Sequence, residues 1–148
     1  PSVRYYTGYG LSNTIVKPPY STLTAYDLNS GTIKWQVRTG DEPRAAAQGA
    51  TGTGVISQRS GIITTVTGLL FHAGEDAKVR AHDVETGKVL WTGTLPAGSR
   101  GGPAMYEVNG RQFLVVNASQ TPQGGRGAAA RMTGQRAYVA FARKDQEP

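Results

Sequence analysis

Four acidic residues of this 148-residue chain could take part in chemistry through their carboxylates. Asp27 or Asp83 could act as a general base. Both occupy the same position of a repeated pattern, however, which favours a structural role in which a short side chain bonds to nearby turn amides. Glu75 and Asp76 are adjacent and offer the oxygen ligands that calcium prefers. Because they fall where a tight turn would join two strands, a solvated hairpin is the favoured interpretation.

The two histidines and the two tryptophans are the other candidates. His72 and His82 lie on expected strands, and no third metal ligand occurs at a useful spacing, so the sequence does not favour a metal role. Trp35 and Trp91 could stack on a flat ligand, but their place in the repeat favours packing between structural units. The sequence contains no Cys, which excludes disulfides and Cys-based metal sites.

An eleven-residue pattern occurs twice, at residues 25–35 and 81–91, with Ala, Asp, Gly and Trp in the same places. Repetition at a fixed offset indicates stacked copies of one supersecondary unit. Each copy predicts a β-hairpin, in which a strand ends at Asp, a Gly-containing turn follows, and a second strand carries the tryptophan. We expect the tryptophan to share one face of its strand with the β-branched residue two positions earlier. These pairs are Ile33 with Trp35 and Val89 with Trp91.

The pattern A-x-D-x-x-x-G-x-x-x-W resembles the tryptophan-docking motif of the pyrroloquinoline quinone (PQQ) dehydrogenases, which are β-propellers. The flanking segments at 18–23, 68–74 and 95–103 resemble the C-terminal blades of that family. Pro18-Pro19-Tyr20, before the first copy, most resembles the membrane-bound glucose dehydrogenase branch. The resemblance covers about residues 18–116 and predicts an all-β fold, a partial β-propeller of about two and a half four-stranded blades.

The strand pattern divides the chain into parts of such a propeller. The expected strands are 22–27, 33–37, 62–66, 69–73, 78–82, 88–92, 104–108, 111–117 and 136–142. They give an unmatched segment at 1–17, a half blade at 18–38, a loop at 39–60, a complete blade at 61–95, and a three-stranded last blade at 96–148 with a loop at 118–135. A propeller ring needs four to eight blades. We therefore expect the remaining blades to come from a longer polypeptide or from another copy of the chain.

The resemblance implies a redox function. In the family, PQQ lies near the ring axis, a calcium ion acts as Lewis acid, an aspartate takes the alcohol proton, and a hydride passes to the quinone. The family's catalytic aspartate and metal ligands belong to upstream blades, so no catalytic or metal-binding residue is assigned here and the chain alone is expected to be inactive. The residues expected to contact the cofactor are Arg100, Gly101, Gly102, Pro103 and Asn117, with the residues up to Gln120 following Asn117.

Arg100 is proposed because PQQ carries three carboxylates, which an arginine can bind in bidentate geometry. The alternative is that Arg100 is an ordinary surface charge. Beyond Asn117 the sequence departs from relatives, since Ser119-Gln120-Thr121-Pro122 replaces the glycine-rich segment common there. The sequence leaves open whether that part of the cofactor loop is preserved.

Two functional classes remain on sequence grounds. The first is part of a PQQ-dependent dehydrogenase of alcohols or sugars, periplasmic by resemblance. The second is a cofactor-free propeller that serves as an assembly or interaction scaffold. The net charge of +6 comes from scattered Lys and Arg residues, so a nucleic-acid partner is not expected. No apolar run approaches the length of a membrane span.

Overall fold

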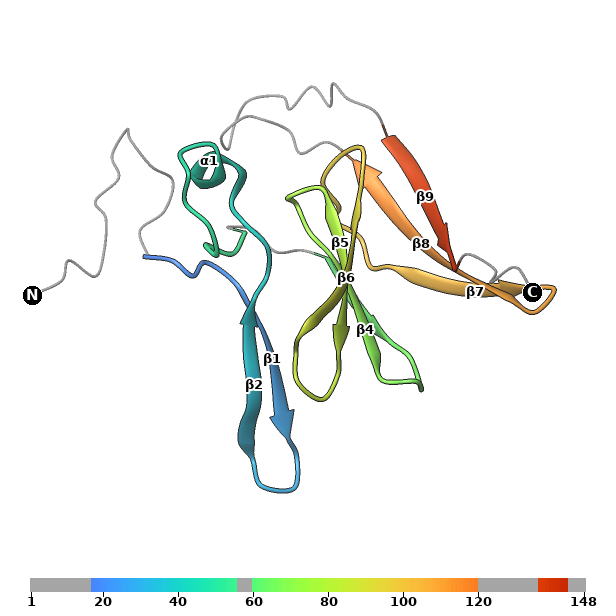
Figure 1. The fold of residues 1–148 in the computed structure, drawn as a ribbon, viewed down its shortest axis with the longest axis horizontal. Helices are drawn as coiled ribbons and strands as arrows, with labels where there is room; N and C mark the ends of the chain where they lie inside the picture. The colour runs from blue at the N-terminus through green and yellow to red at the C-terminus, as the bar shows by residue number, and fades with distance from the viewer. Residues whose placement is uncertain (1–16, 56–59, 120–135, 144–148) are drawn as a thin grey trace, which may run out of the picture. The chain divides into compact units, whose positions relative to one another are not determined.

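The computed structural model describes residues 17–55, 60–119 and 136–143, which form nine strands and one short helix (Figure 1). The predicted all-β fold, a partial β-propeller, is confirmed. The chain divides into two compact units, residues 1–58 and 59–148, and each is described by itself. In the described part of the chain, no helix is long and apolar enough to cross a membrane.

The first unit contains one antiparallel hairpin of β1 (Thr22–Asp27) and β2 (Thr32–Arg38). The turn between them has the predicted chemistry. Gly31 adopts a φ of 68°, which glycine tolerates without strain. The Asn29 amide donates to Oδ1 of Asp27 at 2.8 Å, and this bond lowers the pKa of Asp27. Asp27 is thus a turn residue, as its place in the repeat predicts.

A short helix, α1 (Pro43–Ala46), interrupts the segment that was expected to be loop from 39 to 60. That expectation was wrong at these four residues. Proline at the start of a helix has the required φ and needs no hydrogen-bond acceptor, and alanine has the highest helix propensity. The prediction of a loop, which rested on the content of small residues, therefore overlooked one helical turn.

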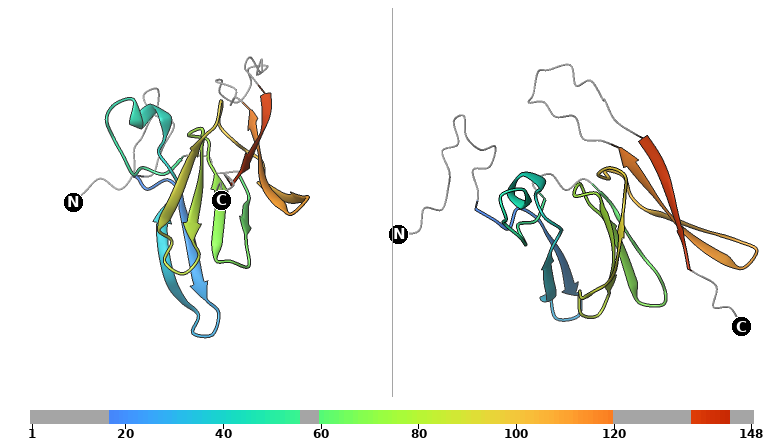
Figure 2. Two further views of the ribbon diagram at one scale, coloured as in Figure 1. Left: turned by 45° about the vertical axis from the view of Figure 1, so that its right-hand side comes forward. Right: turned by 45° about the horizontal axis from the view of Figure 1, so that its top comes forward.

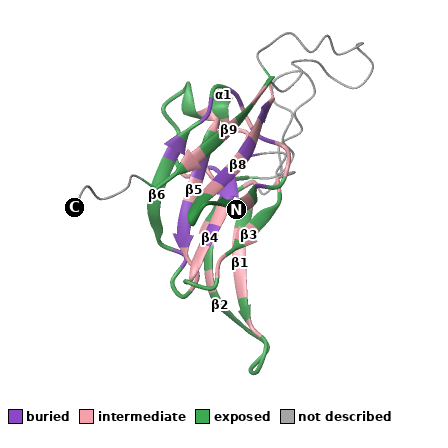
Figure 3. Cartoon of the chain, turned by 90° about the vertical axis from the view of Figure 1, so that its right-hand side faces the viewer, coloured by how far each residue is buried: buried purple, intermediate pink, exposed green. Residues whose placement is uncertain are grey.

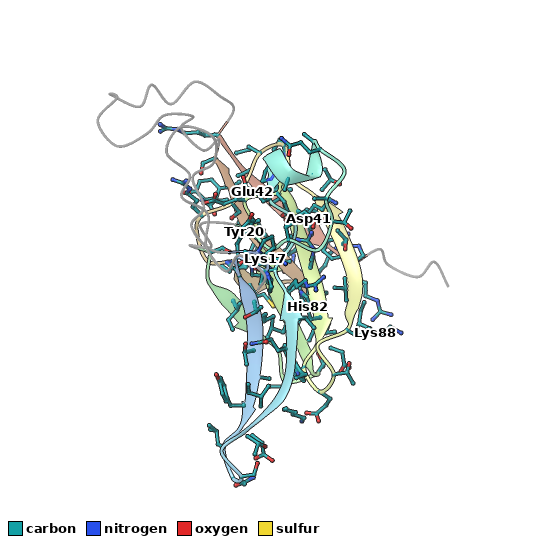
Figure 4. The ribbon with its side chains drawn as sticks, turned by 90° about the vertical axis from the view of Figure 1, so that its left-hand side faces the viewer. Lys17, Tyr20, Asp41, Glu42, His82 and Lys88 are labelled. Atoms are coloured by element: carbon teal, nitrogen blue, oxygen red, sulfur yellow. The ribbon has the colours of Figure 1, made fainter. Side chains whose placement is uncertain are left out.

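Hydrogen bonds close the two sides of this loop on each other. Asp41 and Gly54 form an isolated parallel bridge, and the Thr53 amide donates to Oδ1 of Asp41 at 3.1 Å. The Glu42 amide donates to Oγ1 of Thr53 at 2.9 Å. Figure 4 shows Asp41 and Glu42 beside α1. The described part of the loop is therefore a closed structure with internal bonds rather than an extended connector.

The second unit contains two sheets. The first is a complete four-stranded blade in the order β3-β4-β5-β6, with all neighbours antiparallel. Its strands are β3 (Ile62–Thr64), β4 (Leu69–Ala73), β5 (Lys78–Asp83) and β6 (Val89–Thr94). The second sheet has the order β7-β8-β9, with β7 (Ala104–Val108), β8 (Arg111–Ser119) and β9 (Arg136–Ala142). β8 includes Ala118 and Ser119, which were expected to begin a loop, while residues 120–135 of that loop lie outside the described residues.

A β-bulge changes the faces of the tryptophan-bearing strand in both copies of the repeat. In the complete blade, Ala81 is opposite Trp91 and His82 is opposite Val89, so Leu90 is the extra residue. Ala81 and His82 are consecutive in β5, so their side chains point to opposite faces of the sheet. Their partners Trp91 and Val89 must therefore point to opposite faces as well. The predicted shared face was therefore wrong. The first hairpin has the same bulge, with Ala25 opposite Trp35 and Tyr26 opposite Ile33.

A hydrophobic core joins the two sheets of the second unit, which lie side by side in both views of Figure 2. Its buried residues are Ala73, Val79, Leu95, Ala97, Leu114, Val116 and Ala118. Figure 3 shows buried stretches on β4, β5 and β8, the middle strands of the two sheets. Each buried Val or Leu contributes roughly 1.5–3 kcal/mol, so this layer supplies most of the apolar stabilisation of the unit.

The two sheets approach each other closely where their first strands begin. A Cβ atom on Gly61, just before β3, would lie 3.1 Å from Cα of Gly102, just before β7. Real side chains rarely tolerate such a distance. The two backbones can therefore approach this closely because Gly61 has no side chain.

Candidate functional site

The segment from Leu95 to Pro103 joins the two sheets of the second unit, and backbone hydrogen bonds hold it on both sides. On one side, the Ser99 amide donates to the Gly74 carbonyl at 2.9 Å, in the turn between β4 and β5. On the other side, the Ser119 amide at the end of β8 donates to the Gly98 carbonyl at 2.9 Å. The segment, called the connecting loop below, is thus fixed between the two sheets.

An ion pair anchors the centre of the connecting loop. Nε of Arg100 donates to Oε1 of Glu75 at 2.8 Å. The Arg100 side chain is 34% exposed and that of Glu75 is 13% exposed. Next to it, Nη1 of Arg80 donates to Oδ1 of Asp76 at 3.2 Å, and both of these side chains are largely buried.

Glu75 and Asp76 lie in the turn between β4 and β5, as predicted, but the expectation that this turn is solvated was wrong for their side chains. Both carboxylates are mostly buried because an arginine neutralises each of them. The spacing of four residues between Asp76 and Arg80 was one available signal for the second pair. Arg100 is 25 residues from Glu75, and only the fold brings the two together.

Asn117, near the end of β8, bonds to the connecting loop through its side chain. Oδ1 of Asn117 accepts from the Ser99 hydroxyl at 2.9 Å and from the Gly101 amide at 3.1 Å. A Cβ on Gly101 would lie 2.6 Å from that oxygen, so this approach requires glycine. The structure thus brings Gly101 and Asn117 together.

The remaining residues predicted to contact a cofactor lie on the same stretch of loop. Gly102 is exposed, whereas Pro103 is buried immediately before β7. Gln120 lies outside the described residues. Ser99 and Glu75, which sequence reasoning did not select for this role, contact the predicted residues directly.

The two histidines are buried next to each other in the complete blade. The rings of His72 and His82 have centroids 6.4 Å apart, and each residue is only 1% exposed. Burial, with smaller contributions from His82 and Arg80 that Asp76 partly opposes, lowers the pKa of His72 to about 4. Nδ1 of His82 lies 3.0 Å from the Gly87 carbonyl. Among the described residues, no group of three His, Cys, Asp or Glu could hold a metal ion.

Trp91 packs against the neighbouring sheet. Its ring meets that of Phe141 on β9 edge-on, with centroids 5.3 Å apart and an interplanar angle of 78°. A Cβ on Gly93 would lie 2.5 Å from the indole. The missing side chain at Gly93 therefore leaves room for Trp91 to contact Phe141, which is the contact that a packing role predicts.

Comparison with known proteins agrees with this fold. Residues 5–114, more than half of the chain, match the family model described as "PQQ: Glucose/ethanol/alcohol dehydrogenase, beta-propeller domain". The match extends into the N-terminal segment for which the sequence suggested no relative. It also includes the whole connecting loop.

Curated relatives come from the same family. The chain is 40% identical over 118 residues to the "Probable quinate dehydrogenase (quinone)" of Xanthomonas campestris pv. juglandis, which covers 72% of this chain and 14% of that protein. It is 37% identical to the glycerol dehydrogenase large subunit of Gluconobacter thailandicus, over 69% of this chain and 15% of the relative. It is 32% identical to the quinoprotein glucose dehydrogenase of Escherichia coli (strain K12), over 69% of this chain and 13% of the relative.

Solved structures show the same architecture. A europium-containing methanol dehydrogenase has a TM-score of 0.51 and 25% identity, over 67% of this chain and 15% of that one. The quinohemoprotein alcohol dehydrogenase from Comamonas testosteroni has a TM-score of 0.57 over 82% of this chain and 16% of that one; at 18% identity, it supports the fold alone. The chain spans about one seventh of the length of the curated relatives. On these grounds the chain belongs to the PQQ β-propeller family of glucose, ethanol and alcohol dehydrogenases.

Proposed function

We propose that this chain is the C-terminal part of a quinoprotein dehydrogenase that oxidises an alcohol or a sugar with PQQ as hydride acceptor. The observation that carries the proposal is the connecting loop of a propeller of this family, in which the Arg100 guanidinium donates to Glu75 and the Gly101 amide donates to Oδ1 of Asn117 on β8. The relatives named above are called dehydrogenases of quinate, glycerol and glucose, all of which carry several hydroxyl groups. This supports a hydroxylated substrate.

The residues of the connecting loop, together with Asn117, fit the chemistry of PQQ. The three carboxylates of PQQ need N–H donors, and a guanidinium is well suited to bind one of them. Arg100 is one-third exposed, and among the described residues its guanidinium bonds to Glu75 through Nε alone. Gly102 is exposed and has no side chain, so a ligand can come close to the backbone there. Asn117 adds an amide group.

Arg100, Glu75 and Pro103 have binding or positioning roles in this proposal. When bound, PQQ supplies the quinone that accepts the hydride, with calcium expected as Lewis acid. Arg100 neutralises and orients a carboxylate, while Glu75 fixes the guanidinium in advance. Pre-organisation of this kind reduces the entropy lost on binding. Pro103 stiffens the end of the loop.

The catalytic aspartate and the calcium ligands are assigned to blades outside this chain. The chain alone is therefore proposed to be inactive, and the remaining blades of a longer polypeptide, or another copy of the chain, are its proposed partners. Trp35 and Trp91 are proposed to act as blade-packing residues of the tryptophan-docking type. A periplasmic location is proposed on the basis of the family.

The proposal is tested with the full-length protein supplied with PQQ and calcium. Reduction of a redox dye with quinate, glycerol, glucose or simple alcohols, together with bound quinone seen by absorbance, is the expected result. Arg100→Ala should raise the Kd for PQQ about 10-fold or more, since hydrogen bonds to charged groups contribute roughly 1.5–3 kcal/mol. Lys88→Ala is the matched control, because it removes an exposed cation from the turn of the β5–β6 hairpin (Figure 4). The absence of both turnover and bound quinone would instead support the cofactor-free scaffold.

A further inference from the structure

We propose that Ser99 is a positioning residue, which fixes the Asn117 side chain so that its amide nitrogen donates to a carboxylate of the bound cofactor. The inference rests on the proposed function and adds a residue that family resemblance did not select. It is carried by a three-residue hydrogen-bond arrangement among Ser99, Gly101 and Asn117.

The orientation of the Asn117 amide follows from its partners. A backbone N–H can only donate, so the Asn117 atom that lies 3.1 Å from the Gly101 amide must be the oxygen. The Ser99 hydroxyl donates to the same oxygen at 2.9 Å. With both donors on Oδ1, the Nδ2 group must point away from them.

Ser99 is tied to this role by its burial. The residue is 0% exposed, and a buried hydroxyl without a hydrogen bond costs free energy. Its hydroxyl donates to Oδ1 of Asn117, and its backbone amide donates to the Gly74 carbonyl at 2.9 Å. Ser99 therefore fixes the Asn117 amide relative to the turn between β4 and β5.

The chemistry of the exposed donors identifies the kind of ligand group. Among the residues that the structure describes, no acceptor takes up Nδ2 of half-buried Asn117. Arg100 lies between Ser99 and Gly101 in the chain, and its Nε already binds Glu75. The amide N–H of Asn117, on β8, and the guanidinium of Arg100, on the connecting loop, are both donors. The matching ligand group is an anionic acceptor, and the carboxylates of PQQ are of that class.

The first test reverses the donor without disturbing the loop. In the full-length protein, Asn117→Asp keeps an oxygen for Ser99 and Gly101 but places a negative charge where the amide was. The Kd for PQQ, measured by equilibrium binding, should rise roughly 10- to 100-fold, with little change in thermal stability. Gln112→Glu is the matched control, since it makes the same amide-to-acid change on an exposed residue at the other end of β8 and should leave the Kd unchanged.

The second test asks whether Ser99 acts through Asn117. Ser99→Ala should raise the Kd for PQQ about 2- to 10-fold, and this effect should disappear in an Asn117→Ala background. Independent effects of the two substitutions, or tight PQQ binding by Asn117→Asp, would overturn the inference while leaving the proposed function intact. Failure of the unmodified full-length protein to bind PQQ would instead overturn the proposed function, and this inference with it.

Discussion

The two copies of the repeated hairpin, β1–β2 and β5–β6, have the same backbone but different surroundings. Both contain the aspartate-bonded turn, a glycine with φ near 70°, and the bulge before the tryptophan. Yet Tyr26 is 60% exposed, whereas His82 at the equivalent position is 1% exposed. β5 has β4 on its other side, while among the described strands β1 pairs with β2 alone. Local sequence therefore specifies the hairpin, and neighbouring strands decide what it buries.

Acid should separate the two hairpins most strongly. Burial keeps the pKa of His72 at about 4, below its ordinary value of 6.5. As the pH falls from 6.5 towards 4, His72 binds a proton in the unfolded chain but not in the folded blade. The free energy of unfolding that His72 contributes is fully present above pH 6.5 and is lost over this range, by up to about 3 kcal/mol. Hydrogen exchange, corrected for intrinsic rates, should show β4 and β5 losing protection in this range while β1 and β2 change less. His72→Gln should remove the difference, and equal losses in both hairpins would contradict the prediction.

The next largest effect on stability should come from exchanging the residue two positions after each tryptophan. Gly93 in the complete blade corresponds to Val37 in the first hairpin, 56 residues earlier. Gly93→Val should destabilise the second unit by about 2 kcal/mol, because a side chain there would collide with Trp91 and Phe141. The reverse change, Val37→Gly, should cost about 1 kcal/mol through backbone entropy and lost packing. Hydrogen exchange in β6 and β2 measures the two losses of stability. A larger loss for Val37→Gly than for Gly93→Val would show that the packing argument is wrong.

The smallest effect should come from the turn aspartates. Both turns are exposed, but Oδ1 of Asp83 accepts from both the amide and the hydroxyl of Thr86 at 2.8 Å, whereas Oδ1 of Asp27 accepts from the Asn29 amide at 2.8 Å. Asp83→Ala should therefore cost about 1 kcal/mol, and Asp27→Ala should cost less. Exchange rates of the Thr86 and Asn29 amides report each turn. Asp83→Asn and Asp27→Asn keep the acceptor oxygen and should largely preserve both turns. If they lose as much stability as the Ala variants, the charge of the aspartate rather than its hydrogen bonds stabilises the turn.

Most of the fold could be predicted because the repeat carries its own local signals. The turn residues Asp83 and Gly87 have sequence preferences that do not depend on distant partners, and strand bounds near them agree with expectation to within about one or two residues. The helix α1 was overlooked because a single turn starting at Pro43 gives too short a pattern to recognise.

The bulge and the details of the site could not be predicted in the same way. In β6 the run Val89-Leu90-Trp91 breaks the alternation of apolar and polar residues and was a usable signal, but Ile33-Lys34-Trp35 alternates normally and still contains the bulge. Glu75 meets Arg100 only because the connecting loop crosses the turn between β4 and β5. Such contacts depend on how two sheets are stacked, which periodicity does not report.

The close approach of Gly61 to Gly102 has a consequence for the dimensions of a complete ring. Where the first strands of adjacent blades begin, the spacing between them sets how sharply successive blades can turn around a hub. Glycine at position 61 permits the short spacing seen between these two blades. A methyl group there would have to push the start of β7 away by a few tenths of an ångström.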